Sequence, residues 1–368
     1  MKKSFLFIMV FSLTLMPLEV ICCTSWMVFS NLTGNKTNIL HKNRDSASRK
    51  VYISFSSDNA KHKWISLGGH GTNMGINSVG VAGVMNSGEK CIDPPIVKGK
   101  KDTPQMLQFI LENSASATQC VEKLQKLIKD GDYSHGSRGS VFMFMDNKVG
   151  YICETTSKVC TVQRIDQGFT VRASVWQNPN MYQYSRESID IYLKATVRAY
   201  IAITGLNQML DKDGKISLSG IFEHSRSFIP PEKSPFTRSI CGKSTNSAAS
   251  IEIDKEYPDV LSTMYATIGH PRHTVYLPIP VVAKKALKSM KNRQWSTTSY
   301  QRLDKLKLNS PIPKEWLNFE KESISKYTNA KEQARKLLAN GKREEAIKLI
   351  NSTAWKIWCE AQKLLNIR

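Results

Sequence analysis

The chain begins with a short basic and apolar leader that ends at a pair of cysteines, and this leader decides where the folded protein starts. Lys2 and Lys3 precede an almost entirely apolar run over residues 5–18, which is the pattern of a secretory signal peptide. The run is shorter than the roughly 20 residues that a membrane-spanning helix requires. We therefore predict that residues 1–22 are removed and that the exported chain, periplasmic or secreted, starts at Cys23.

Cleavage at this point gives Cys23 a thiol nucleophile and a free α-amine on one residue. The unperturbed pKa of an α-amine is about 7.7–8.0, so the amine can act as general base for its own side chain. An alternative stays open, because residues 20–23 also weakly resemble a lipoprotein processing site. Lipidation of Cys23 would block the amine and leave an envelope lipoprotein with a binding role.

The residues after Cys23 predict a β-hairpin. Residues 23–30 are typical of a strand, residues 31–37 of a turn, and residues 38–41 are extended again. If the turn centres near Gly34 and Asn35, opposite residues have numbers that sum to about 68 or 69. Cys23 then faces Asp45 or Ser46, with the Asp45 carboxylate beside the α-amine.

The rest of the chain predicts strands and helices in blocks. Helices are expected from Pro104, with Thr103 as N-cap, and over residues 116–128 and 185–210; strands are expected over 75–86, 140–145, 149–154 and within 264–277. Blocks of this kind favour antiparallel sheets covered by helices, an α+β fold. Residues 314–339 and 342–365 predict a C-terminal helical hairpin. The predicted units are a main domain, residues 23–310, and a helical extension, residues 311–368.

The positive charge of the chain is concentrated near its C-terminus. The formal net charge is +21, and residues 281–368 contain 20 Lys and Arg against 8 Asp and Glu. This region is either an ordinary solvated face or a contact for an anionic envelope surface. We expect no nucleic-acid partner, because the chain is predicted to be exported and contains none of the usual reader motifs. The sequence does not indicate an oligomeric state.

The cysteines other than Cys23 suggest structural roles. Cys153 and Cys160 flank a predicted hairpin turn and are the best candidates for a disulfide, with isolated buried thiols as the alternative. A papain-like protease would need Cys241 with His270 or His273, but Cys241 lacks the sequence context of such nucleophiles. No Cys and His spacing resembles a zinc site, and we predict no cofactor.

Four segments, in this order, resemble a known superfamily. They are Cys23-Thr24-Ser25, residues 41–45 (His-Lys-Asn-Arg-Asp), residues 75–86 (Gly-Ile-Asn-Ser-Val-Gly-Val-Ala-Gly-Val-Met-Asn) and residues 177–179 (Gln-Asn-Pro). This ordered set behind a leader resembles the N-terminal-nucleophile (Ntn) hydrolases, in the branch of choloylglycine hydrolases, penicillin V acylases and penicillin-forming acyltransferases. The resemblance covers residues 23–280 and implies a four-layer αββα sandwich of two antiparallel sheets. It also implies hydrolysis of a linear amide C–N bond, or transfer of its acyl group.

The resemblance implies a role for each matching residue. Cys23 matches the nucleophile that forms a thioester, and Asp45 matches the carboxylate that holds the amine. Asn178 matches an asparagine that contacts the amine and the reacting oxygen, and Asn86 matches an oxyanion donor, a task for which a side-chain amide is suited. The implied partner is a small-molecule N-acyl amide substrate. Its identity, and the choice between hydrolase and acyltransferase, stay open.

Two positively charged positions complete the expected site. Lys42 stands where the bile-salt branch usually has arginine; it keeps the charge and loses the bidentate fork. The sequence leaves open whether Lys42 or Arg44 points inward. Arg238 loosely matches a second active-site arginine, with Lys243 as the alternative.

Overall fold

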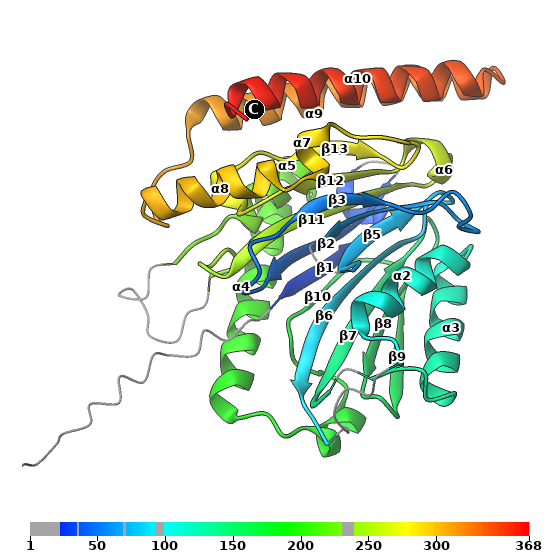
Figure 1. Cartoon of the computed structure of the whole chain (residues 1–368), viewed down its shortest axis with the longest axis vertical. Coiled ribbons are helices and arrows are strands. Elements are labelled where there is room, and N and C mark those ends of the chain that lie inside the picture. Colours follow the sequence, from blue (N-terminus) through cyan, green and yellow to red (C-terminus); the bar gives the residue numbers. More distant parts are fainter. Residues whose placement is uncertain are drawn as a thin grey trace, which may run out of the picture.

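Two antiparallel sheets form the centre of the molecule, and helices cover their outer faces (Figure 1). The structure is a computed structural model that describes residues 23–34, 37–68, 71–92, 99–134, 136–229 and 239–367. The predicted leader, residues 1–22, lies outside the described residues. The predicted α+β class, with two antiparallel sheets between helices and a C-terminal helical hairpin, is confirmed.

The first sheet has six strands in the order β10-β1-β2-β11-β12-β13. Because β2 pairs with both β1 and β11, residues from the two ends of the chain meet beside Cys23. The strands are β1 (Thr24–Val28), β2 (Thr37–Asp45), β10 (Phe169–Arg172), β11 (Thr245–Asp254), β12 (Thr263–Thr267) and β13 (Leu277–Pro280).

The predicted β-hairpin of β1 and β2 is present, but its register differs from the prediction. Thr24 pairs with Asn43, so continuing the register places Arg44, rather than Asp45 or Ser46, opposite Cys23. The cause is the short helix α1 (Ser30–Thr33), which occupies the loop where extended chain and a simple turn were expected. Gly34 ends α1 in the left-handed conformation, with φ +64°.

The second sheet has seven strands, each paired antiparallel with the next along the chain. They are β3 (Tyr52–Phe55), β4 (Trp64–Gly68), β5 (Met74–Asn77), β6 (Ala82–Lys90), β7 (Arg138–Met145), β8 (Gly150–Thr155) and β9 (Cys160–Ile165). The predicted strands over 140–145 and 149–154 correspond to β7 and β8.

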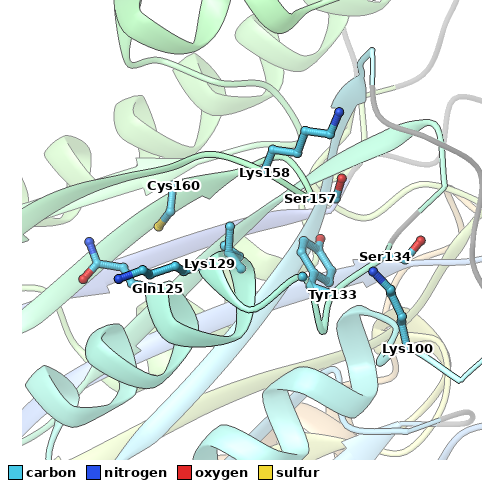
Figure 2. A pocket seen from close by; sticks show the side chains of 10 residues that line it. Lys100, Gln125, Lys129, Tyr133, Ser134, Ser157, Lys158 and Cys160 are labelled. Carbon is cyan, nitrogen blue, oxygen red and sulfur yellow. The ribbon is translucent and has the colours of Figure 1, made fainter.

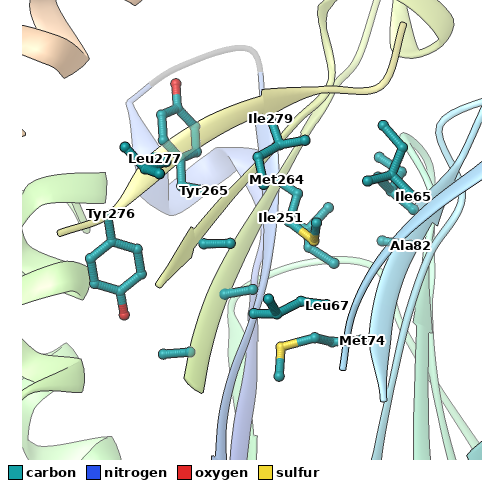
Figure 3. Close-up of a cluster of buried hydrophobic side chains, with 14 of the residues drawn as sticks. Ile65, Leu67, Met74, Ala82, Ile251, Met264, Tyr265, Tyr276, Leu277 and Ile279 are labelled. Carbon is teal, nitrogen blue, oxygen red and sulfur yellow. The ribbon is translucent and has the colours of Figure 1, made fainter. Parts of the chain in front are cut away.

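The largest core lies between the two sheets. In Figure 3, Ile65, Leu67 and Met74 of the second sheet face Ile251 and Met264 of the first. Because side chains alternate between the two faces of a strand, the central strands bury one set of residues here and the other set under helices. The polar residues around Cys23 share this inner face.

Helices α2 (Thr103–Asn113) and α3 (Ala117–Lys129) cover the second sheet. Leu107 and Leu124 pack with Phe142 and Phe144 of β7 in a core of their own. The N-cap of α2 is Asp102 rather than the predicted Thr103, because Asp102 and Gln105 bond each other's backbone in a capping box.

Helices α4 (Ile189–Asp213) and α5 (Leu218–Ser225) cover the outer face of the first sheet. Trp26 of β1 packs there with Ala199 and Leu206. The remaining short elements are η1 (Pro179–Tyr184), α6 (Pro258–Leu261), η3 (Pro271–His273), α7 (Lys288–Lys291) and α8 (Gln294–Lys305).

The predicted C-terminal hairpin consists of α9 (Lys314–Ala339) and α10 (Arg343–Leu364). Gly341 lies between them with φ +73°, a conformation that glycine adopts without strain. The hairpin packs on β13, where the Trp358 indole donates to the Pro278 carbonyl at 2.8 Å. Within the described residues, no helix is long and apolar enough to cross a membrane.

Candidate active site

Cys23 lies at the N-terminal end of β1 as a free thiol and is 5% exposed. Its Sγ lies 3.8 Å from the backbone oxygen of Asp45. Ser25, two residues on and therefore on the same face of β1, donates to Asn86 Oδ1 of β6 at 2.8 Å. Since β6 belongs to the second sheet, alternation places the Cys23 side chain in the polar region between the sheets.

Lys42 and Asn86 form the centre of this polar region. Lys42 Nζ lies 2.9 Å from Asn86 Oδ1 and also donates to the Met85 carbonyl. An ammonium only donates, so the Asn86 oxygen faces Lys42 and Ser25, and its Nδ2 donates to the Arg172 carbonyl at 3.3 Å. Burial lowers the pKa of Lys42, whereas the adjacent Cys23 thiol favours its charged form.

Arg44 lies on the same face of β2 as Lys42, so both residues point toward Cys23. Burial lowers the pKa of Arg44. The negative charge that Cys23 and Tyr300 carry when they are deprotonated acts in the opposite direction. Its Nη1 is buried and has no hydrogen-bond partner among the described residues. The structure therefore leaves one donor of this guanidinium available beside the thiol.

The Asp45 carboxylate points toward α4, on the other side of the first sheet. Its Oδ1 accepts from Thr245 Oγ1 at 2.6 Å, and its Oδ2 forms a buried ion pair with Arg198. A register change of one residue exchanges the two faces of a strand, which explains why the predicted cross-strand position of Asp45 is taken by Arg44. Asp45 still adjoins Cys23 through its backbone oxygen.

Asn178 caps the short helix η1 and makes no hydrogen bond with Cys23. Its Oδ1 accepts from the Asn180 amide at 3.0 Å, and its backbone N–H donates to Glu154 Oε2 at 2.9 Å. Ser174 is the residue of this segment that reaches Cys23, with Oγ 3.5 Å from the Cys23 carbonyl. Nothing in the local sequence distinguished Ser174, because serine is common in extended runs.

A cavity of about 320 Å³ adjoins this region. Glu154, Arg172 and Asn178 line it, and Arg172 Nε lies 3.4 Å from Glu154 Oε1. Arg172 also pairs with Ser25 across β10 and β1. Arg172 therefore connects the cavity with the polar residues around Cys23, because its carbonyl also accepts from Asn86.

Cys241 and His270 come together, as the papain-like alternative would require. The distance from Cys241 Sγ to His270 Nε2 is 3.8 Å. However, burial raises the pKa of Cys241 to about 12 and lowers that of His270 to about 3. His270 Nε2 also lies 3.0 Å from the Gly242 carbonyl, and its Nδ1 accepts from the Arg272 amide. The ring therefore carries its proton on Nε2 and cannot accept one from the thiol there.

The remaining sequence predictions have mixed outcomes. Arg238 lies outside the described residues, and Lys243 is exposed. Cys153 and Cys160 are free thiols in this structure, so the predicted disulfide is not formed. The hydrogen bond between them, together with burial, raises the pKa of Cys153.

No protein-family model matches the sequence, and no curated protein matches it. Among solved structures, the chain is similar to a conjugated bile acid hydrolase from Clostridium perfringens, with a TM-score of 0.45 and 14% identity over 70% of this chain and 92% of that chain. It is also similar to a penicillin V acylase from Agrobacterium tumefaciens, with a TM-score of 0.43 and 14% identity over 70% of this chain and 86% of that chain.

Proposed function

We propose that this protein is an exported cysteine hydrolase of the Ntn type that cleaves a linear amide C–N bond or transfers its acyl group. The observation that carries the proposal is the position of Cys23, which directly precedes β1 and lies beside two buried cations, Lys42 and Arg44. Positive charge beside a thiol favours the thiolate, which is the reactive form. Removal of residues 1–22 adds the α-amine that the mechanism needs.

In the proposed reaction, the α-amine of Cys23 takes the thiol proton and the sulfur attacks the amide carbonyl carbon. The carbonyl oxygen becomes an oxyanion in the tetrahedral intermediate. Collapse of this intermediate breaks the C–N bond, and the leaving nitrogen receives the proton from the α-ammonium. The acyl group stays on Cys23 as a thioester until water, or an acceptor amine, attacks it.

Lys42 and Asn86 are assigned to charge stabilisation in this scheme. Lys42 is close enough to Cys23 to interact with its thiolate, and Asn86 is held by Ser25 and Lys42 with its Nδ2 away from them. One oxyanion donor contributes about 2.7–4 kcal/mol to catalysis. For Asn86 to do so, its Nδ2 must exchange the Arg172 carbonyl for the reacting oxygen.

Asp45 is assigned to holding the α-amine, and Asn178 stays a proposed contact of the amine. The support for Asp45 is that its backbone oxygen adjoins Cys23 Sγ, while Thr245 and Arg198 hold its carboxylate in place on the other face of β2. Asn178 would contribute through the adjoining cavity. We assign no role to Arg238 beyond the sequence prediction of a second active-site cation.

The experiment that tests the proposal is intact mass measurement and N-terminal sequencing of the exported protein. The expected result is a chain that starts at Cys23 with an unmodified amine. A diacylated Cys23 would support the lipoprotein alternative instead. A chain that starts elsewhere would remove the proposed general base and overturn the mechanism.

Turnover of a substrate panel then tests the reaction itself. The panel contains bile-salt conjugates, penicillin V and acyl homoserine lactones, and acyl transfer is followed by adding an acceptor amine. Release of the amine product, with a burst of acyl-enzyme on Cys23, is the expected result. An unmodified Cys23 terminus that forms no thioester with any N-acyl amide would contradict the function.

A further inference from the structure

An apolar groove with a positively charged rim lies on the C-terminal hairpin. Its volume is about 710 Å³, and it is bounded by α10 and by the segment that follows β13. Trp355 and Trp358 contribute aromatic surface, and none of its lining residues is acidic. The rim lysines are Lys284, Lys285, Lys348 and Lys356.

These four lysines are exposed, and no ion pair within the described part of the chain involves them. Elsewhere on the same hairpin, Lys326 pairs with Glu360 at 3.2 Å. The basic surface continues onto α7 through Lys288 and Lys291, because Ser289 of α7 hydrogen-bonds Gln362 at 3.2 Å. The positive charge of the groove lysines is therefore not neutralised by an ion pair with any described residue.

Trp355 is the exposed aromatic residue of this groove. It is 37% exposed, and Lys285 Nζ lies 5.5 Å from its ring centroid. Trp358, in contrast, is buried and hydrogen-bonded to the Pro278 carbonyl. An exposed indole flanked by lysines is the arrangement that partitions into the headgroup region of a membrane.

A second basic cavity shows what distinguishes this groove. That cavity has a volume of about 630 Å³ and is lined by Lys100, Lys129 and Lys158 (Figure 2). Its aromatic residue, Tyr133, is buried. It therefore presents comparable charge without an exposed aromatic side chain to enter a bilayer.

We propose that the groove on α10 is a docking surface for an anionic lipid bilayer. The rim lysines attract acidic headgroups, and Trp355 enters the boundary between headgroups and acyl chains. The positive charge selects an anionic surface, and the apolar floor favours a bilayer over a soluble polyanion. This inference does not depend on the proposed amide hydrolysis, because no residue of the groove belongs to the site at Cys23.

The test measures partitioning of the mature, unlipidated chain onto vesicles of mixed phosphatidylglycerol and phosphatidylcholine. A lysine near an anionic membrane contributes about fivefold to the partition coefficient. The triple variant K284Q/K285Q/K356Q should therefore lose about a hundredfold in partitioning. The control variant K100Q/K129Q/K158Q removes the same charge from the cavity in Figure 2 and should bind like the unchanged protein.

Three further measurements complete the test. Trp355→Ala should lower partitioning several-fold, binding should weaken as salt is added, and vesicles of phosphatidylcholine alone should bind poorly. Equal loss in the two triple variants would overturn the proposal, since it would show dependence on net charge alone. Binding to soluble heparin without binding to vesicles would also overturn it, because the partner would then be a polyanion.

Discussion

Two groups of buried charge, one under the C-terminal hairpin and one at Cys23, differ in how their charges are balanced. Arg226 and Glu320 form a two-fold ion pair with N···O distances of 2.7 and 2.6 Å, and the Tyr276 amide also donates to Glu320. At Cys23, Lys42 hydrogen-bonds to neutral oxygens, and one buried nitrogen of Arg44 has no partner in the part of the chain that the structure describes.

The difference indicates which group is structural and which is functional. A buried charge without full compensation lowers stability, so it persists where function needs it. The Arg226–Glu320 pair is fully hydrogen-bonded and connects the end of α5 to α9, so it has a structural role. The cations at Cys23 lack such a counter-charge, so they can stabilise the negative charge of a thiolate or an oxyanion.

The largest expected effect comes from the nucleophile itself. Cys23→Ala should lower turnover of a responsive N-acyl amide by more than about a thousandfold, because no thioester can form. Cys241→Ala should leave turnover largely unchanged, because Cys241 faces a histidine that cannot accept its proton. Steady-state kinetics and labelling with a thiol-directed acyl probe measure both. Labelling that survives in Cys23→Ala and disappears in Cys241→Ala would refute the N-terminal mechanism.

Loss of the Arg226–Glu320 ion pair should change the stability of the fold rather than the rate of turnover. Glu320→Gln leaves Arg226 buried without a counter-charge and should lower the free energy of unfolding by about 3–5 kcal/mol. Urea denaturation measures this change. The matched control, Glu360→Gln, breaks the half-exposed pair with Lys326 and should change it by less than about 1 kcal/mol. Similar changes in the two variants would contradict the structural role.

Asp45 tests whether a buried ion pair can also serve catalysis. Asp45→Asn should lower turnover about a hundredfold through misplacement of the amine, and it should also destabilise the fold by leaving Arg198 unpaired. The double variant Asp45→Asn/Arg198→Gln removes the second effect and should recover stability without recovering turnover. Recovered turnover would mean that Asp45 only neutralises Arg198.

Arg44 should behave in the opposite way to Glu320. Arg44→Gln removes a desolvated cation and should leave the free energy of unfolding equal or higher. Loss of its available donor should raise KM about tenfold for a substrate with an anionic group. Measuring kcat and KM separately, with Arg44→Lys as the charge-conserving control, checks this. An unchanged KM together with lower stability would make Arg44 a structural residue.

The smallest expected effect is a loss of stability at acidic pH through the ion pair between Asp254 and Arg335 of the C-terminal hairpin. Burial raises the pKa of Asp254, but hydrogen bonds from Arg335 and the Tyr257 amide lower it overall. A depressed folded-state pKa stabilises the fold above the unfolded-state value of about 3.9, and this contribution is lost as pH falls through the folded-state pKa. In Asp254→Asn, the free energy of unfolding should therefore depend less on pH in this acidic range. Denaturation at a series of pH values between neutral and acidic measures this change. An unchanged curve would show that the ion pair with Arg335 contributes little.

The sequence determined the elements whose signals are local. The C-terminal hairpin was predicted to within one or two residues, because helical periodicity and Gly341 act over a few neighbouring positions. The hairpin that follows Cys23 was predicted for the same reason. In contrast, β11 (Thr245–Asp254) escaped prediction, because all ten of its residues are buried and no alternation marks it.

Only the tertiary structure decided which side chains meet at Cys23. The sequence supplied Cys23, Lys42, Asn86 and Asp45 as candidates. The short helix α1 shifted the strand register, so that Arg44 lies on the inner face in place of Asp45. Arg198 is far along the chain and pairs with Asp45 because α4 packs on the first sheet. The chemistry of a side chain is a local property, whereas its partners depend on long-range strand pairing and on which face of a sheet is covered.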